Sequence, residues 1–289
     1  MLLIALALGG CAKTAPTTDS SPTPTSPTTT SPTSTPEPTP TTLRISGYNS
    51  DAVHTLDLAT GAIVATTEGV PGAQSVRPDG DGGWLVVAEK VGRVLRLDAG
   101  GDVVGTVAEG LDAPTSAVIG PDGDLYVGLF GAGQVLRLDP TTGEQQGVVA
   151  DGLQGPDAGV VFGPDGTLWV PCFDGRRIVG LDPETGDIVD EHTGVDAPRS
   201  LVFDGRDRLW ATAWRDDAVV RFGPRGQVTE TFAVSRPSGM VLEPSGEALW
   251  VIDDQVSVLR RLDAATGDVL TEIDTAALGV DGATFLAWP

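Results

Sequence analysis

From residue 43 onward the chain alternates short apolar runs with short polar turns. Runs such as Val135-Leu-Arg-Leu138 place apolar and polar residues in turn, as a strand buried on one face does. Turn sequences such as Pro-Asp-Gly (121–123) and Asp-Pro-Thr-Thr-Gly (139–143) separate the runs. Proline presets the first turn angle, aspartate accepts backbone N–H groups and glycine adopts a positive φ, so both sequences favour tight reversals. The pattern predicts an all-β fold of antiparallel strands.

The pattern repeats with a period near 41 residues. The residue that opens one turn in each repeat marks the period, at Asp57, Asp98, Asp139, Asp182, Gly223 and Asp263. Successive positions in this series differ by 41, 41, 43, 41 and 40 residues. Repeats of this length, each with room for four short strands, are typical of propeller blades. We therefore expect a β-propeller with six four-stranded blades.

One aromatic residue recurs at a fixed place in the repeats. Tyr126, Trp169, Trp210 and Trp250 each lie 13 residues before the turn position of their repeat, whereas Trp84 lies 14 before its own. A large ring at one strand position can fill the wedge between neighbouring blades. We expect these five side chains to be core residues.

The first and last segments of the repeats complement each other. The segment 43–48 already reads as the second strand of a blade, so the first repeat lacks its inner strand. The segment 280–287 resembles the inner strands at 156–162 and 198–203. We expect the C-terminal strand to join the first blade and close the ring, which removes exposed sheet edges.

The N-terminus has the features of an export signal and an anchor. Leu2–Leu8 is apolar but far shorter than the roughly 20 residues of a membrane span. Leu8-Gly9-Gly10-Cys11 resembles the bacterial lipobox, which implies cleavage before Cys11 and lipidation of its sulfur; a plain secretion signal is the alternative. We predict a signal peptide at 1–10 and a location in the bacterial cell envelope, facing outside the cytoplasm.

Residues 11–42 are dominated by Thr, Pro and Ser after the cysteine. Such a segment has almost nothing apolar to bury, so we predict a disordered linker, with the propeller at 43–289. An extended Pro-rich chain rises roughly 3.1 Å per residue, so the linker could reach about 90 Å from the membrane.

Charge narrows the choice of partners. The chain has 40 acidic and 18 basic residues, a formal charge of −22. A surface this negative repels phosphate backbones, so we do not expect nucleic acid as a partner. The expected partners are the membrane, through the lipid, and an unknown protein, peptide or polar small molecule; we expect a monomer.

The repeat motifs also carry a family resemblance. Gly163-Pro-Asp-Gly-Thr-Leu-Trp-Val170, followed by Ile178-Val-Gly-Leu-Asp-Pro-Glu-Thr-Gly186, is similar to the repeats of NHL-type six-bladed propellers. These are relatives of streptogramin (virginiamycin B) lyase and of the gluconolactonase/senescence-marker (regucalcin) family. The matching residues are turn and core positions, so the resemblance implies the fold far more strongly than any activity.

In such propellers one mouth of the central channel is formed by two sets of loops, those leading into inner strands and those between second and third strands. The strongest candidates for ligand binding in these loops are Tyr48, Asn49, Glu89, Asp157, Phe173, Asp174, Arg199, Trp214, Arg215, Asp253 and Asp281. The same loops carry Gln74, Thr115, Ser238, Asp51, Lys90, Phe130, Arg176, Asp216 and Asp254. This mixture of aromatic, acidic and basic side chains suits a polar ligand or a peptide.

Enzymatic alternatives have weaker support in the residues. The gluconolactonase-like family holds a divalent cation with acidic and Asn ligands, but Asn49 is the sole asparagine of this chain. We expect no cofactor, although Asp157, Asp253 and Asp281 could together hold calcium. The lyase resemblance implies a catalytic His and Glu at the channel, but we expect both histidines, His54 and His192, to lie away from it.

Cys172 has no histidine nearby in the sequence to activate it, so we expect a buried free thiol. The favoured function is therefore an anchored binding or scaffold propeller without a catalytic residue. The alternative is a metal-dependent hydrolase or lactonase that acts at the channel mouth.

Overall fold

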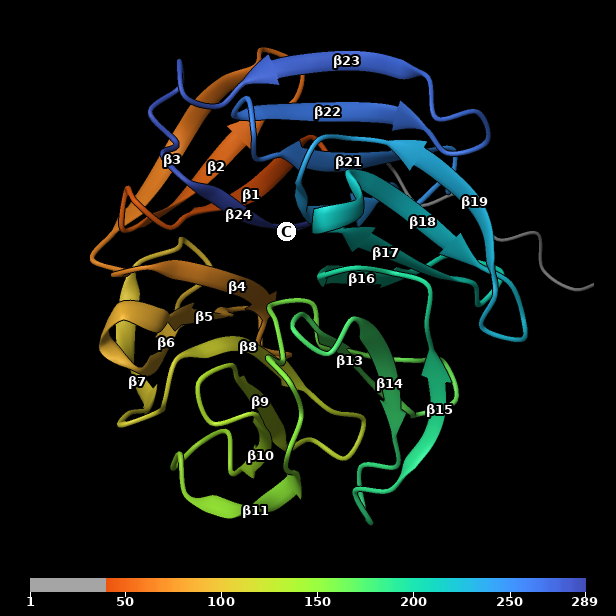
Figure 1. The fold of residues 1–289 in the computed structure, drawn as a ribbon. Coiled ribbons are helices and arrows are strands. Elements are labelled where there is room, and N and C mark those ends of the chain that lie inside the picture. The colour runs from red at the N-terminus through yellow and green to blue at the C-terminus, as the bar shows by residue number, and fades with distance from the viewer. Residues whose placement is uncertain (1–39) are drawn as a thin grey trace, which may run out of the picture. The chain divides into compact units, whose positions relative to one another are not determined.

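The computed structural model describes residues 40–289, which form six four-stranded antiparallel sheets around a central axis (Figure 1). Each sheet is one blade, and its strands run outwards from the axis in chain order. The inner strand of blade 1 is the exception, because it comes from the end of the chain. The fold is the predicted six-bladed β-propeller. Within residues 40–289 no helix is long and apolar enough to cross a bilayer.

Four strands make up each blade, ordered from the axis outwards. Blade 1 contains β24 (Ala283–Ala287), β1 (Thr42–Gly47), β2 (Ala52–Asp57) and β3 (Ala62–Glu68). Blade 2 contains β4 (Ala73–Pro78), β5 (Trp84–Ala88), β6 (Arg93–Leu97) and β7 (Val103–Ala108). Blade 3 contains β8 (Pro114–Ile119), β9 (Leu125–Leu129), β10 (Gln134–Leu138) and β11 (Gln145–Ala150). Blade 4 contains β12 (Val161–Phe162), β13 (Leu168–Cys172), β14 (Arg177–Leu181) and β15 (Ile188–His192). Blade 5 contains β16 (Pro198–Phe203), β17 (Leu209–Ala213), β18 (Ala218–Phe222) and β19 (Val228–Ala233). Blade 6 contains β20 (Pro237–Leu242), β21 (Ala248–Asp253), β22 (Val258–Asp263) and β23 (Val269–Asp274). Two short 3-10 helices, η1 (Glu89–Val91) and η2 (Trp214–Asp216), follow β5 and β17.

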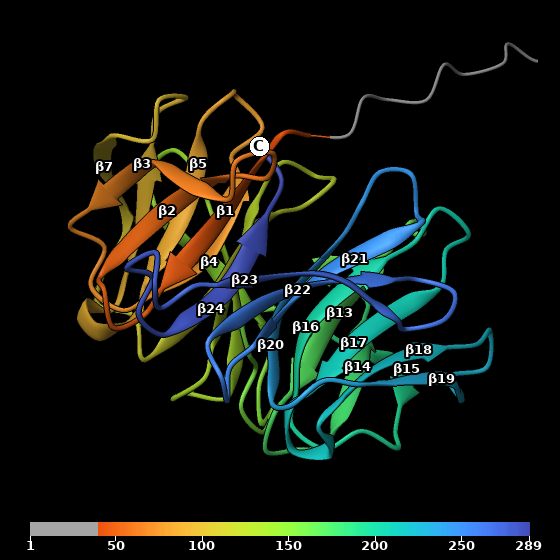
Figure 2. The same ribbon diagram turned by 90° about the horizontal axis from the view of Figure 1, so that it is seen from above.

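The ring closes as the sequence predicts. β24 pairs antiparallel with β1, with Ile45 opposite Leu286 and Ser46 opposite Phe285. Figure 2 shows β24 beside β1 in the sheet of the first blade. Since β1 also pairs with β2, it has a hydrogen-bonded neighbour on both sides. The two ends of the propeller domain therefore share one sheet.

The turn between third and fourth strands uses the predicted aspartate and glycine. In blade 3, Asp139 Oδ1 accepts the backbone N–H groups of Thr141 at 2.8 Å and Thr142 at 2.7 Å. These bonds lower the pKa of Asp139. Gly143 then adopts φ 71°, and a Cβ there would lie within 1.8 Å of the carbonyl oxygen of Val107 in blade 2. Glycine is thus required both by the turn and by the neighbouring blade.

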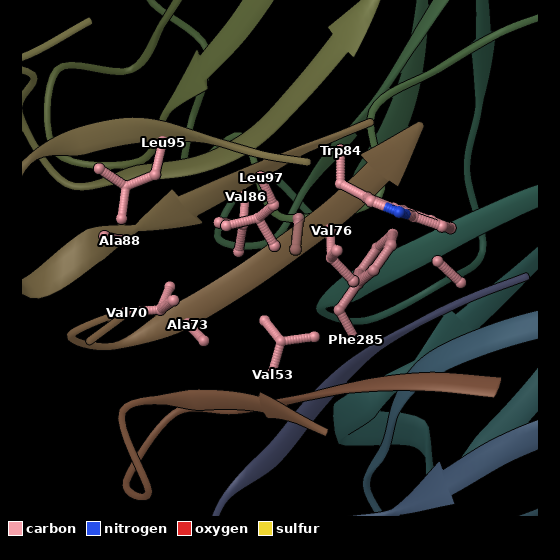
Figure 3. Close-up of a cluster of buried hydrophobic side chains, with 12 residues drawn as sticks. Val53, Val70, Ala73, Val76, Trp84, Val86, Ala88, Leu95, Leu97 and Phe285 are labelled. Atoms are coloured by element: carbon pink, nitrogen blue, oxygen red, sulfur yellow. The ribbon is translucent and has the colours of Figure 1, made fainter. Parts of the chain in front are cut away.

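The five recurring aromatic residues are buried between blades. Four of them pack against the following blade and one, Trp84, packs against the preceding blade. Tyr126, Trp169, Trp210 and Trp250 each pack in a cluster shared with the following blade. Trp84 packs instead with residues of blade 1 (Figure 3). Because neighbouring residues of a strand point to opposite faces, the one-residue shift of Trp84 turns its ring to the other side of the blade.

One aromatic side chain of the inner strands packs in a cluster that spans the ring. Phe285 of β24 is 1 % exposed and packs in one cluster with Trp84, Val76 and Ala158 (Figure 3). Ala158 precedes β12 in blade 4, so this cluster joins blades that lie across the ring from each other. The guanidinium of Arg77 stacks on the Phe285 ring at 4.6 Å. Phe285 therefore forms a floor beneath the mouth of the channel.

Candidate binding site

The mouth lies where the inner strands begin, and one backbone hydrogen bond shapes it in every blade. The first residue after each second strand donates its N–H to the carbonyl of the residue just before the inner strand or, in blade 4, just before the isolated β-bridge at Pro156. The pairs are Tyr48–Gly282 (2.8 Å), Glu89–Gly72 (3.1 Å), Phe130–Ala113 (2.9 Å), Phe173–Gly155 (2.8 Å), Trp214–Ala197 (3.0 Å) and Asp254–Arg236 (3.3 Å). All six acceptor residues have positive φ, from 42° to 70°. This bond fixes six equivalent positions around the mouth.

The side chains at these six positions, which we call the mouth ring, are Tyr48, Glu89, Phe130, Phe173, Trp214 and Asp254. All six are partly exposed. Phe130, Phe173 and Trp214 follow one another on blades 3, 4 and 5, with ring centroids 6.1 and 5.9 Å apart. We call these three residues the aromatic arc. The sequence predicts all six residues at the mouth, but their equivalence became visible only in the structure.

Packing against the following blade positions the rings. A Cβ at Gly155 would lie 2.9 Å from Cε2 of Phe130, so the absence of a side chain there makes room for the ring. On Phe173 the guanidinium of Arg215 stacks at 4.7 Å, and it also approaches Asp174 at 3.4 Å. Arg236 stacks on Trp214 at 5.0 Å. The arc thus has fixed rings with polar groups at its edge.

Two pairs of polar side chains lie deeper in the mouth. Arg199 Nε donates to Asp157 Oδ2 at 3.1 Å, and these side chains are 16 % and 5 % exposed. Gln74 Nε2 donates to Glu89 Oε2 at 2.5 Å. Burial raises the pKa of Glu89, nearby Asp157 raises it further, and Arg199 opposes the shift. Since Asp157 and Arg199 belong to blades 4 and 5, the Glu89 carboxylate of blade 2 faces them across the channel.

Of the remaining predicted site residues, Asn49 and Asp281 lie on the rim of the mouth, whereas Asp253 is buried within blade 6. Asn49 Nδ2 donates to Asp281 Oδ1 at 3.2 Å, on the exposed rim of the mouth. Asp253 is the last residue of β21; it is 1 % exposed and forms an ion pair with Arg260 at 3.0 Å. It therefore contributes to blade 6 and not to the surface of the mouth. Its partner is on another strand, so sequence alone did not reveal this pairing.

The three carboxylates proposed for calcium are not gathered into one site. Asp157 binds Arg199, Asp253 binds Arg260, and Asp281 accepts a bond from Asn49. Across residues 40–289 no group of three or more His, Cys, Asp or Glu side chains has the geometry to hold a metal ion. The hydrolase alternative stays a prediction that these contacts do not test.

The two histidines and Cys172 lie outside the mouth, within the strands of the blades. His54 lies in β2, between Ser50 Oγ at 3.0 Å and Thr66 Oγ1 at 3.2 Å. His192 lies in the outer strand β15. Burial raises the pKa of the Cys172 thiol to about 11, and this side chain is 0 % exposed. The predicted positions of both histidines and the buried state of the thiol are confirmed.

A hollow of about 920 Å³ lies on the opposite face of the propeller, between blades 5 and 6. Its walls are the turns 202–208 and 242–247. Two carboxylates in these turns are paired with arginines, Asp204 with Arg208 and Glu243 with Arg261, both at 2.7 Å. We place the candidate site at the mouth despite the size of this hollow, because the mouth combines three neighbouring, partly exposed rings with Glu89, a carboxylate that forms no ion pair within residues 40–289.

Comparison with known proteins adds support at the level of the fold. No protein-family model and no curated protein matches the chain. A solved protein of unknown function from Bacteroides caccae is 14 % identical, with a TM-score of 0.69 over 86 % of this chain and 98 % of that one. The common architecture is the six-bladed β-propeller. A nidogen/laminin complex contains a chain that is 14 % identical, with a TM-score of 0.70 over 85 % of this chain and 97 % of that one. A catalytically inactive virginiamycin B lyase from Staphylococcus aureus, solved with quinupristin, is 18 % identical, with a TM-score of 0.59 over 85 % and 89 %. The predicted likeness to NHL-type and streptogramin lyase propellers is confirmed for the fold.

Proposed function

We propose that the protein is a binding module that is anchored to the bacterial cell envelope and recognises a ligand or partner protein through the mouth ring. The observation that carries this proposal is the aromatic arc. Three consecutive rings are held in place with part of their surface facing solvent. Rigid, partly exposed aromatic side chains contribute strongly to binding because they bury a large area with little loss of side-chain freedom.

The fold itself does not require these rings. Glu89 and Asp254 occupy the equivalent positions in blades 2 and 6 and make the same backbone hydrogen bond. Because that bond uses only the main chain, any side chain can stand there. Three neighbouring aromatic residues at positions open to any residue type are therefore better explained by contact with a ligand than by folding.

Two of the similar solved structures are consistent with a binding role. The virginiamycin B lyase was solved with quinupristin, and the other similar chain was solved as part of a nidogen/laminin complex. Propellers of this shape are thus found with a small molecule and with a protein. We propose recognition of a protein, peptide or polar small molecule by this chain, and not the activity of either relative.

The anchor is the second part of the proposal. Cys11 and the linker lie outside the described residues, so their support is the sequence Leu8-Gly9-Gly10-Cys11. When the protein is expressed in bacteria, we expect mass spectrometry to show the added mass of a diacyl group at Cys11. We also expect the protein to enter the detergent phase in a detergent partition assay. Cys11→Ala should abolish both. Membrane association that survives Cys11→Ala refutes the lipid anchor.

The binding role can be tested without a known ligand. We suggest selecting a phage-displayed peptide library on the wild-type protein and testing the selected peptides on Phe173→Ala/Trp214→Ala. Arg206→Ala, on the opposite face, is the matched control. We expect peptides that bind the wild type and the control but lose at least tenfold in affinity on the double variant. Selected peptides that bind all three proteins equally, or a failure to select any, contradict a binding role for the mouth.

A further inference from the structure

The charges inside the mouth are unbalanced at Glu89. Asp157 and Glu89 both face the channel, and the guanidinium of Arg199 pairs with Asp157. The hydrogen-bond partner of Glu89 is Gln74, a neutral amide. Within residues 40–289 no basic side chain forms an ion pair with Glu89. The inner mouth therefore has one carboxylate more than it has cations.

The neighbouring lysine does not remove this imbalance. Lys90 is turned away, with Nζ at 2.7 Å from Asp51 Oδ1 and 2.9 Å from the carbonyl oxygen of Tyr48. The groups that face Glu89 are thus Gln74, Asp157, Arg199, Tyr48 and, more weakly, Lys90. Glu89 is half-buried, and burial raises its pKa. A half-buried carboxylate without a charged partner is stabilised by any cation that reaches it.

The environment of Glu89 also favours a cation. In the mouth ring Glu89 stands between Tyr48 of blade 1 and Phe130 of blade 3. The faces of aromatic rings attract cations, and combinations of rings and carboxylates recognise ammonium groups. Tyr48, Phe173 and Trp214 already carry Lys90, Arg215 and Arg236 on one face. Of the four rings in the mouth ring, Phe130 alone has no cation of residues 40–289 stacked on it.

A second acceptor lies beside Glu89. Gln74 is 6 % exposed, and its Oε1 has no hydrogen-bond partner while its Nε2 is held by Glu89. A primary ammonium has three N–H donors, so it can bond to the carboxylate and still satisfy this amide oxygen. A quaternary ammonium has no such donor.

We propose that the mouth binds a primary ammonium group attached to an apolar or aromatic body, with the ammonium against Glu89 and the body on Phe130 and Phe173. This inference rests on the proposed binding function and specifies the chemistry of the ligand. The side chain of a lysine or the N-terminus of a peptide that begins with an apolar residue has this chemistry.

Two small probes of similar size and opposite charge test the proposal. Phenethylammonium and phenylacetate are titrated into the full chain by calorimetry, and benzyl alcohol serves as the neutral reference. We expect phenethylammonium to bind at least tenfold more tightly than phenylacetate or benzyl alcohol, because it alone can form a charge-assisted hydrogen bond with Glu89. Glu89→Gln, which keeps the shape and removes the charge, should abolish this preference. Glu144→Gln, an exposed carboxylate in a turn of the opposite face, should retain it.

The pH dependence provides a second readout that needs no variant. Only ionised Glu89 attracts the ammonium, so binding of phenethylammonium should weaken as the pH falls through the raised pKa of Glu89, while binding of benzyl alcohol stays constant. Equal affinity for the three probes, absence of ammonium binding, or an unchanged preference in Glu89→Gln overturns the inference. Peptides selected at the mouth would in those cases still support the proposed binding function, so the two failures are distinguishable.

Discussion

The aromatic floor of the channel makes Phe285→Ala the most informative stability variant. The ring is 1 % exposed and packs against residues from blades 2 and 4 as well as its own. Truncation of a buried phenylalanine removes its transfer free energy and leaves a cavity, at a cost of about 3–5 kcal/mol. Arg77 also loses the ring on which its guanidinium stacks, a contact of about 1 kcal/mol. We therefore expect a loss of roughly 4 kcal/mol or more in the free energy of unfolding.

Equilibrium unfolding in urea, followed by tryptophan fluorescence, measures this loss directly. For a domain of this size about 2–4 °C is lost per kcal/mol, so the melting temperature should fall by roughly 8–16 °C. Phe285→Leu is the control, since a smaller change in volume should cost only about 1–1.5 kcal/mol. A loss below about 1 kcal/mol in Phe285→Ala would show that the ring does not support packing across the channel.

Three further predictions concern single positions. Gly143→Ala should lower the free energy of unfolding in urea by about 2 kcal/mol or more, because residue 143 has a positive φ and the new Cβ would meet a carbonyl of blade 2. The control is Gly147→Ala, which has open space around its Cβ and should cost under about 0.5 kcal/mol. Equal losses in the two variants would refute the turn argument. Burial lowers the pKa of His192, so as the pH falls below about 6.5 the unfolded chain takes up a proton on this side chain before the folded protein does. Stability should therefore fall between pH 7 and 5, and His192→Gln should reduce this slope; an identical slope contradicts the assignment. In a Cys11→Ser background Cys172 should react with a thiol reagent at pH 8 only after unfolding, because the buried thiol has a pKa of about 11; rapid reaction of the native protein contradicts this.

Local turn chemistry made most of the fold predictable. Asp-Pro-x-Thr-Gly and Pro-Asp-Gly set the strand boundaries, and their period indicated the number of blades. The missing inner strand of the first repeat indicated the closure by β24. These features are local, so single-sequence reasoning reaches them. The direction of Trp84 was also within reach, because a one-residue shift always exchanges the faces of a strand.

The site was predictable in outline only. The loops of the mouth followed from the topology, but the placement of Asp253 depended on Arg260, a partner on another strand. Phe285 was missed as the channel floor, although the equivalent positions of the other inner strands carry small residues, namely Ser75, Ser116, Ala158, Ser200 and Gly239. A comparison of the six inner strands with one another contains this signal. The excess of negative charge at Glu89 could not be predicted from the sequence, because it depends on the contacts that Gln74, Asp157 and Arg199 make in the folded protein.

The double pairing of β1 bears on how the protein would withstand mechanical load. The chain enters β1 at Thr42, on the face opposite the mouth, and leaves it at Gly47, directly before Tyr48 of the mouth ring. A tether pulling at Thr42 against a partner held at the mouth would load β1 along its own length. The hydrogen bonds to β2 and β24 would then be sheared together and not opened one after another. β1, the strand that β24 pairs with to close the ring, is therefore also the strand best placed to carry tension.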